Sequence, residues 1–208
     1  MDPPEALLLL SLGFVVGLSG ALIPGPLLVY TINESLQKGK WTGLRVILGH
    51  AIVEVAIFLL LIFGLLGFAT EPLFVSGVSI IGGLALIVMG IASLRNVKGG
   101  IPAQAVKTKH GVILGGIIFS VFNPGIPIWW ATAGLALLNF GHETMGMLGM
   151  ILVLVGHWGA DFGWFTLVSL TTHRSSDTLL QKGWYRTVRI ILSLLLLGIG
   201  AYFIASGI

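Results

Sequence analysis

Long apolar stretches joined by short polar connections run through the whole chain. Six of them are long enough to cross a bilayer as a helix, which takes about 20 residues. They run over residues 6–33, 44–69, 73–94, 111–138, 146–170 and 187–207. A backbone in lipid has to satisfy its own hydrogen bonds, and a helix does so within one segment. The pattern therefore predicts an all-α integral membrane protein with six transmembrane helices.

Composition narrows the possible functions. Hydrophobic residues make up 56% of the chain and charged residues 9%, which excludes an ordinary soluble domain. The absence of cysteine excludes disulfides, thiolate metal sites and thiol redox chemistry. The net charge of +3 does not indicate a nucleic-acid partner, because the basic residues form no patch with base-reading residues. We expect a lipid bilayer and a small molecule as partners and no cofactor, and the sequence leaves a homodimer open.

Basic residues lie in every second connection. All 11 Lys and Arg residues fall in or at the edge of the first, third and fifth connections. The second and fourth connections contain Glu71, His142 and Glu143 but no Lys or Arg. Because cytoplasmic loops are enriched in Lys and Arg, we expect the odd-numbered connections in the cytoplasm and both termini outside.

The two halves of the chain carry the same features in the same order. The first half has Pro24-Gly25-Pro26 and then Gly49, His50 and Glu54. The second has Asn123-Pro124-Gly125-Ile126-Pro127 and then Gly156, His157 and Asp161. With three spans per half, the second half enters the membrane from the opposite side. We therefore expect two inverted three-helix repeats, residues 1–104 including the linker and residues 105–208, an arrangement typical of secondary transporters.

Glycines four residues apart precede each proline element. They are Gly13 and Gly17 in the first half and Gly111 and Gly115 in the second. Small residues at this spacing let two membrane helices approach closely. We expect both pairs to lie at contacts between helices.

The proline elements predict that the first and fourth spans are broken. Proline removes a backbone donor and clashes with the carbonyl one turn earlier. Unwound backbone inside a bilayer must be buried in protein or line a wet cavity. Where the helix resumes, its N-terminus offers amide donors and a positive dipole end to a carboxylate. The candidate substrate-binding or gating residues are Pro24, Gly25, Pro26, Asn123, Pro124, Gly125 and Pro127. The alternative is a simple proline kink in each span.

Each half also places a histidine and an acid four residues apart in its next span. His50 and Glu54 share one helix face, as do His157 and Asp161. A charge at this depth costs roughly 2.5–3.5 kcal/mol, so such residues face the bundle interior or a water-filled route. A carboxylate beside a histidine can exchange protons near neutral pH. The four residues are therefore candidates for proton coupling or for binding a substrate cation.

Two other interpretations of these pairs remain open. One is structural, with a neutral imidazole bonded to a backbone carbonyl and a protonated acid. The other is a divalent metal held by two histidines and two carboxylates, which requires the second and fifth spans to face each other. The tryptophans of the fourth and fifth spans, Trp129, Trp130, Trp158 and Trp164, pack the helices or stack on a ligand cation.

These elements together resemble the LysE-type translocator family of amino-acid exporters. The resemblance rests on Pro24-Gly25-Pro26, the basic connection after it, Asn123-Pro124 and six spans in about 200 residues. It implies export of an amino acid or a close relative across a prokaryotic cytoplasmic membrane, driven by the proton gradient. Family members often have Lys after Asn-Pro and Asp in the second span, where this chain has Gly125 and Glu54.

The leading hypothesis is a proton-coupled, secondary-active exporter of an amino acid or similar metabolite. A divalent-cation exporter is the main alternative. An intramembrane enzyme is less well supported, because the chain has no His-Glu-x-x-His zinc motif.

Overall fold

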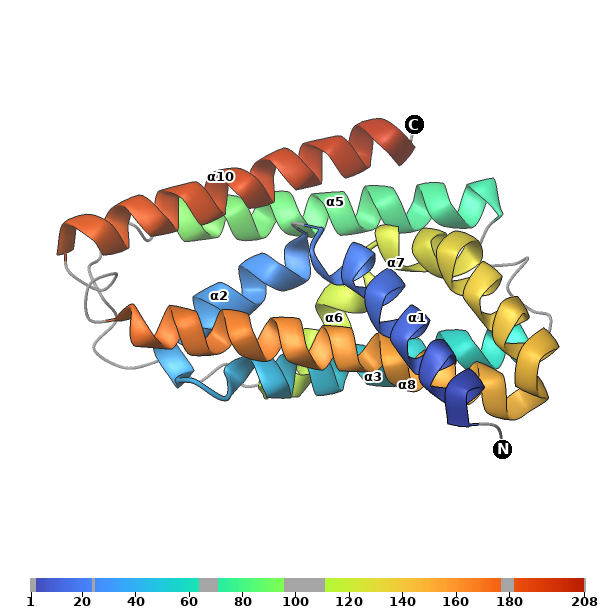
Figure 1. Cartoon of the computed structure of the whole chain (residues 1–208). Helices are drawn as coiled ribbons and strands as arrows, with labels where there is room; N and C mark the ends of the chain where they lie inside the picture. The colour runs from blue at the N-terminus through green and yellow to red at the C-terminus, as the bar shows by residue number, and fades with distance from the viewer. Residues whose placement is uncertain (1–2, 24, 64–70, 96–110, 177–181, 208) are drawn as a thin grey trace.

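The computed structural model describes residues 3–23, 25–63, 71–95, 111–176 and 182–207. Regular structure within these residues is helical (Figure 1). The helices are α1 (Pro3–Ala21), α2 (Pro26–Lys38), α3 (Thr42–Ile62), α5 (Pro72–Arg95), α6 (Val112–Val121), α7 (Gly125–Trp129), the π-helical turn η2 (Trp130–Gly134), α8 (Leu135–Arg174) and α10 (Lys182–Gly207). Every apolar stretch predicted to span the membrane contains one or more of these helices. The predicted linker and the boundary between residues 104 and 105 lie outside the described residues.

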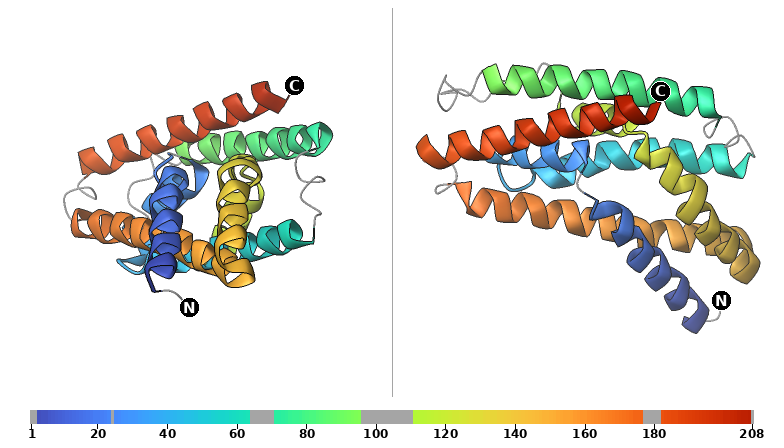
Figure 2. Two further views of the ribbon diagram at one scale, coloured as in Figure 1. Left: turned by 45° about the vertical axis from the view of Figure 1, so that its right-hand side comes forward. Right: turned by 90° about the horizontal axis from the view of Figure 1, so that it is seen from above.

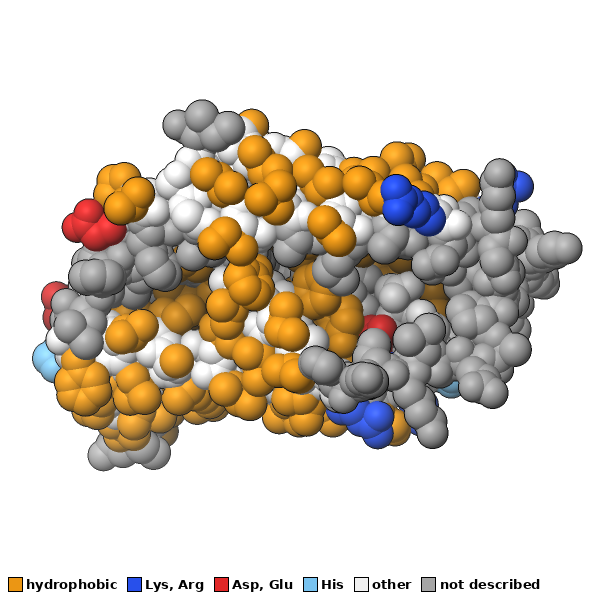
Figure 3. Space-filling model, turned by 180° about the vertical axis from the view of Figure 1, so that it is seen from behind, with side chains coloured by type: hydrophobic (Ala, Val, Ile, Leu, Met, Phe, Trp, Pro, Cys, Tyr) orange, Lys and Arg blue, Asp and Glu red, His pale blue; other side chains and the backbone are white. Residues whose placement is uncertain are grey.

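The helices have the length and surface of membrane helices. Four helical stretches are long and apolar enough to cross a bilayer: Pro3–Ala21, Thr42–Ile62, Gly125–Arg174 and Ile190–Gly207. Hydrophobic side chains cover much of the face drawn in Figure 3. Val15, Ile52 and Leu194 are 63%, 54% and 55% exposed, which in water would be a large apolar patch and in a bilayer is the lipid-facing surface. The prediction of an all-α membrane protein is confirmed, and the count of six spans remains a prediction.

Both predicted breaks are present. Helix α1 ends at Ala21 and α2 begins at Pro26, whereas α6 ends at Val121 and α7 begins at Gly125. Gly25 is extended, with φ −134° and ψ −178°, and Pro26 takes the first helical position, where a missing N–H is not needed. Pro24 lies outside the described residues. Each stretch is thus interrupted rather than merely kinked.

The predicted connection at 139–145 is corrected by the structure. Helix α8 continues through it and reverses direction only at Met145 and Gly146. Gly146 has φ +59°, a conformation that favours glycine. On either side of this turn, Gly141 and Gly149 meet backbone to backbone. The connection is therefore a tight turn between two closely packed helical arms. The sequence predicted a longer loop because polar residues such as His142 are typical of loops.

Helix α1 packs along α8, and their glycines make the contact possible. Gly13 of α1 faces the carbonyl of Val153, and Gly156 of α8 faces the carbonyl of Leu10. A side chain at either glycine would occupy the position of that carbonyl oxygen. The two helices can approach this closely only because both positions lack a Cβ.

Helix α6 packs along α3 with a matching set of contacts. Gly116 faces the carbonyl of Val46, and Gly49 faces the carbonyl of Ile113. In both helix pairs each glycine follows the contacted carbonyl residue of its own helix by three positions. Of the predicted pair, Gly115 lies at a contact between helices, against the side chain of Tyr30 in α2, whereas Gly111 has no neighbour within 4 Å among the described residues. The backbone contact with α3 is made by Gly116 instead. The prediction is therefore confirmed at Gly115 and not at Gly111.

Helices α5 and α10 form a third pair on one side of the bundle (Figures 1 and 2). Gly83 and Gly200 each face the other's carbonyl. Apolar side chains of α10, among them Leu192, Leu196 and Phe203, join a core cluster with residues of α2, α3 and α6. The third pair is therefore packed against the two interrupted segments rather than attached at the edge.

Alanine at a contact glycine is expected to destabilise the fold. Gly116→Ala places a methyl group against the Val46 carbonyl, and overpacking of this kind costs about 1–3 kcal/mol. The matched control is Gly163→Ala, because a Cβ on Gly163 in α8 would meet no atom of the described residues within 4 Å and alanine stabilises a helix relative to glycine. Thermal unfolding in detergent should give a lower Tm for Gly116→Ala and an equal or higher Tm for Gly163→Ala. Equal loss in both variants would contradict the packing.

Candidate functional site

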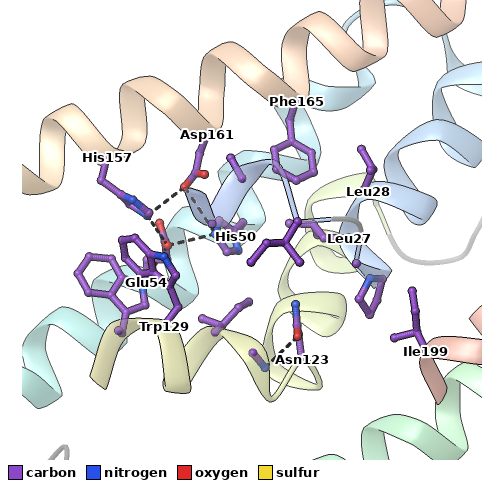
Figure 4. Close-up of a pocket in the computed structure, with 18 of the residues that line it drawn as sticks. Leu27, Leu28, His50, Glu54, Asn123, Trp129, His157, Asp161, Phe165 and Ile199 are labelled. Carbon is purple, nitrogen blue, oxygen red and sulfur yellow. Dashed lines mark hydrogen bonds and ion pairs between the residues drawn. The ribbon is translucent and has the colours of Figure 1, made fainter. Parts of the chain in front are cut away.

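A cavity of about 330 Å³ lies where the two interrupted segments meet (Figure 4). Its walls come from both breaks and from α2, α3, η2, α8 and α10. This volume is at the lower end of the range for small-molecule sites, about 300–1,000 Å³. The cavity therefore has room for a metabolite of amino-acid size.

Four ionisable side chains occupy one end of the cavity. His50 and Glu54 come from α3, and His157 and Asp161 come from α8. The separations are 3.1 Å for His50 Nε2–Glu54 Oε1, 3.7 Å for His50 Nε2–Asp161 Oδ2, 2.8 Å for His157 Nε2–Glu54 Oε1 and 3.2 Å for His157 Nε2–Asp161 Oδ2. The shortest of these contacts joins the two halves of the chain. We call these four residues the His-acid cluster.

The His-acid cluster is buried. Glu54 is 2% exposed, Asp161 and His157 are 3% exposed, and His50 is 7% exposed. Charges in such surroundings are tolerated only when paired and hydrogen-bonded. Two ionised carboxylates beside two neutral imidazoles are not paired in this way. They become paired when a histidine or an acid takes up a proton, or when a cation binds.

Glu54 is the most fully bonded member of the cluster. Trp130 Nε1 donates to its Oε1 at 3.0 Å, and Trp158 Nε1 donates to its Oε2 at 3.0 Å. His157 Nε2 also lies within hydrogen-bonding distance of Oε1. Because donors hold both carboxylate oxygens, Glu54 is fixed in position.

Asp161 is in the opposite state. Its Oδ2 is buried but accepts no hydrogen bond from the described residues, although His157 Nε2 lies 3.2 Å away. We attribute this to His157 having one Nε2–H, which is directed at Glu54. Asp161 therefore lies near both histidine Nε2 atoms, 3.2 Å from His157 and 3.7 Å from His50, but has fewer hydrogen bonds than Glu54.

The contacts of His50 allow its proton to be assigned. We assign the Ser120 hydroxyl hydrogen to the Gly116 carbonyl, 2.7 Å from Ser120 Oγ, so that Ser120 accepts from His50. His50 Nδ1, 2.8 Å from Ser120 Oγ, is then the N–H that donates to Ser120. In a neutral His50 the Nε2 lone pair would face the Glu54 and Asp161 oxygens, and the lone pairs would repel one another. One further proton, on Nε2 or on a carboxyl oxygen, turns this repulsion into a hydrogen bond.

His157 is held differently. Its Nδ1 is buried without a hydrogen-bond partner among the described residues and faces Gly17 of α1. The ring stacks on Trp129, with centroids 4.7 Å apart and planes at 28°. A neutral His157 can donate from Nε2 to Glu54, so it needs no extra proton. The two histidines are therefore not equivalent.

The same atoms also have the spacing of a cation site. Donor atoms of His50, Glu54 and Asp161 lie within 4.8 Å of one another. The sequence requirement that the second and fifth spans face each other is met, because α3 packs against α8. Two carboxylates and imidazole nitrogens suit a divalent transition-metal ion.

Several residues of the proline elements line the cavity, and others do not. Gly25, Pro26, Asn123 and Gly125 line it. Asn123 Oδ1 accepts from the Gly125 amide at 3.0 Å, so this side chain caps the start of α7. Pro124 and Pro127 are not lining residues; Pro124 precedes α7, and Pro127 lies in its first turn, where proline is tolerated.

Some site residues were not predicted from the sequence. Ser120 has no distinguishing motif, and nothing marked Trp130 and Trp158 as partners of Glu54. Trp130 begins the π-helical turn η2, and such turns are frequent at functional sites. Of the four tryptophans that the sequence singled out, Trp129 and Trp130 line the cavity, whereas Trp158 and Trp164 are not lining residues.

Comparison with known proteins identifies the family. The sequence pattern that defines the LysE type translocators matches residues 18–207, which include both breaks and the whole His-acid cluster. The chain belongs to the LysE type translocator family. This LysE type translocator is also similar to the uncharacterized membrane protein PA4757 of Pseudomonas aeruginosa, with 24% identity over 199 residues that cover 90% of this chain and 87% of that protein. No solved structure matches it at a significant level. Family membership makes it a membrane transporter that exports amino acids or related compounds.

Proposed function

We propose that this LysE type translocator is a secondary-active, proton-coupled exporter of an amino acid or a close relative. The observation that carries the proposal is one cavity in which both interrupted segments and the whole His-acid cluster meet. A zwitterion presents a carboxylate and an ammonium group. The start of α2 offers amide donors to the carboxylate, and the acids of the His-acid cluster offer acceptors to the ammonium group.

We further propose that residues 1–104 and 105–208 are inverted repeats. The matching glycine contacts of α1 with α8 and of α6 with α3 support this, as does the mutual contact of Gly83 and Gly200. An arrangement in which each half supplies one break, one histidine and one acid suits a transporter, because rocking of one half against the other exposes the shared site to each side in turn.

The proton enters the mechanism at His50. The Nδ1–H of His50 donates to Ser120, so a neutral His50 has no proton on Nε2 for the acids. Without substrate, the His-acid cluster therefore binds one additional proton. A substrate ammonium group takes over this role when it binds between the acids, because it also donates hydrogen bonds to them. Substrate and proton then compete for one site, and such competition is sufficient for antiport.

The proton gradient supplies enough energy for useful export. Moving one elementary charge across 100 mV is worth about 2.3 kcal/mol. At about 1.4 kcal/mol per tenfold change, this sustains roughly a fiftyfold concentration ratio. We place the protein in a prokaryotic cytoplasmic membrane with both termini outside. This orientation is supported by the basic residues at one end of the bundle, where α2, α5 and α8 end at Lys38, Arg95 and Arg174 (Figure 1).

Efflux from amino-acid-loaded proteoliposomes tests the function. Acidifying the outside should accelerate efflux of the substrate, and collapsing the pH gradient with a protonophore should remove the acceleration. Efflux that is indifferent to the gradient would disprove coupling while leaving export in place.

A divalent-cation exporter is the second candidate, favoured by the donor spacing at His50, Glu54 and Asp161. It predicts that the same vesicles accumulate or release Mn²⁺ or Zn²⁺ and that replacing both histidines by alanine abolishes this flux. Amino-acid efflux that persists in a metal chelator would reject it. An enzymatic role has no support from the family, and it would require substrate turnover without flux across the vesicle membrane.

Ser120→Ala is expected to weaken coupling without abolishing export. Without the Ser120 acceptor, a neutral His50 can carry its proton on Nε2 and donate to Glu54, so the cluster no longer needs the extra proton. The lost hydrogen bond is worth about 1 kcal/mol, or roughly a fivefold drop in the stimulation by an imposed pH gradient. The matched control is Thr171→Ala, since Thr171 is exposed and, within the described part of the chain, its hydroxyl bonds carbonyls of its own helix. Unchanged stimulation in Ser120→Ala would show that the tautomer of His50 plays no part.

A further inference from the structure

The end of the cavity away from the His-acid cluster is apolar. Leu27 and Leu28 of α2, Phe165 of α8, and Ile199 and Phe203 of α10 line it. Figure 4 shows Ile199 at the end opposite His157, with Leu27 and Phe165 between them. Apart from the cluster, Tyr202 is the sole lining residue with an ionisable side chain among the described residues. A charged group placed at this end would lose its hydration without gaining a partner.

Of the two helix starts at the breaks, that of α2 borders the cavity with uncapped amides. No side chain of the described residues caps it, Leu27 and Leu28 line the cavity, and by helix geometry their amides have no acceptor within the helix. The corresponding start of α7 is already capped, because Asn123 Oδ1 accepts from Gly125. The other end of that side chain, Asn123 Nδ2, lies beside Gly25. The free donors are therefore the α2 amides and Asn123 Nδ2.

Asp161 provides the complementary acceptor. Its Oδ2 is buried, lines the cavity and accepts no hydrogen bond from the described residues, whereas donors hold both oxygens of Glu54. The two histidine Nε2 atoms lie 3.2 and 3.7 Å from this oxygen, so Asp161 has fewer hydrogen bonds than Glu54 and can gain one from a cationic donor that enters the cavity.

We propose that the substrate is a neutral amino acid with an apolar side chain of leucine to phenylalanine size. Its carboxylate binds the α2 amides and Asn123 Nδ2, its ammonium group binds Asp161, and its side chain fills the apolar end between Phe165 and Ile199. This assignment rests on the proposed export of amino acids and adds the class of side chain. Basic and acidic amino acids are excluded, because their second charge would lie against leucine, isoleucine and phenylalanine side chains.

Competition in proteoliposomes tests the assignment. Counterflow of labelled L-leucine is measured with unlabelled L-leucine, L-phenylalanine, L-alanine, L-lysine and L-glutamate as competitors. Each buried CH₂ is worth roughly a fourfold change in affinity, so L-leucine should compete at least tenfold better than L-alanine by this scale. L-Lysine and L-glutamate should not compete. Isoamylamine, which lacks the carboxylate, and isocaproate, which lacks the ammonium group, should compete far more weakly than L-leucine.

Variants separate the subsites. Asn123→Ala should weaken competition by L-leucine but leave that by isoamylamine unchanged, since the amine has no carboxylate to bind. Ile199→Glu places an acid at the apolar end and should turn L-lysine into a competitor while L-leucine becomes weaker. If this variant is not produced in folded form, Ile199→Ala replaces it and should narrow the preference for L-leucine over L-alanine.

The possible failures are distinguishable. Counterflow of L-lysine or L-glutamate without L-leucine overturns the proposed side-chain class but leaves amino-acid export intact. Flux of Mn²⁺ or Zn²⁺ with no amino-acid flux overturns the proposed function as well. Equal competition by isoamylamine and L-leucine in the unmodified protein overturns the carboxylate subsite.

Discussion

Replacing Glu54 by glutamine is expected to abolish transport and to lower the stability of the protein. Indole N–H groups donate to both carboxylate oxygens, and a glutamine would direct its own NH₂ at one of these donors. Breaking a buried charged interaction by changing one partner costs about 3 kcal/mol, or roughly a hundredfold in rate or affinity. The variant should therefore show efflux near the background of empty vesicles and a reduced Tm in detergent.

The control for this variant is Glu143→Gln. Glu143 is exposed near the turn of α8, so the substitution removes the same charge outside the cavity. Its efflux and Tm should match those of the unmodified protein. Normal efflux by Glu54→Gln would refute the role assigned to the His-acid cluster, because Glu54 is its most fully hydrogen-bonded member.

Asp161→Asn is expected to separate transport from stability. Asp161 Oδ2 accepts no hydrogen bond from the described residues, although both histidines lie within 3.7 Å, so neutralising it removes a buried charge that has fewer hydrogen bonds than Glu54. Efflux should fall by roughly tenfold or more, because a hydrogen bond to a charged group is worth about 1.5–3 kcal/mol. The Tm should stay the same or rise, as is common where a site is strained for function.

Measuring Tm and efflux on the same Asp161→Asn preparation decides between two roles. A drop in Tm equal to that of Glu54→Gln would mean that both acids are structural. Unchanged efflux would mean that Asp161 does not meet the substrate. The contrast between the two acids is more informative than either variant alone, since their burial is nearly the same.

Much of the fold follows from local patterns. Apolar length predicts the helices, and proline predicts the interruptions, because a missing donor and a steric clash act within one turn whatever surrounds them. Features that depend on which helices pack together were less predictable from the sequence. Gly115 and Gly116 are both small residues in α6, and only the packed partner shows that Gly116 faces α3. The turn at Gly146 was placed too early because exposed polar residues resemble a loop.

The sequence predicted which ionisable residues form the site, but it did not predict which of them contact one another. The spacing of His50 and Glu54 places them on one face of α3, and their duplication in α8 indicates that they act together. That His157 Nε2 lies closer to Glu54 than to Asp161 of its own helix follows only from the packing of α3 against α8. The same holds for Ser120 and the two indole donors, which carry no sequence signature and lie far from Glu54 and His50 along the chain.

The most direct test of the account is the lumenal pH during export. Proteoliposomes are loaded with L-leucine, or with the competitor that the protein proves to export, and with a pH-sensitive dye. The pH is equal on both sides and the membrane potential is clamped. If substrate and proton exchange at the His-acid cluster, the lumen acidifies in step with efflux, and Glu54→Gln shows neither change. Efflux at the full rate with a constant lumenal pH would contradict the account.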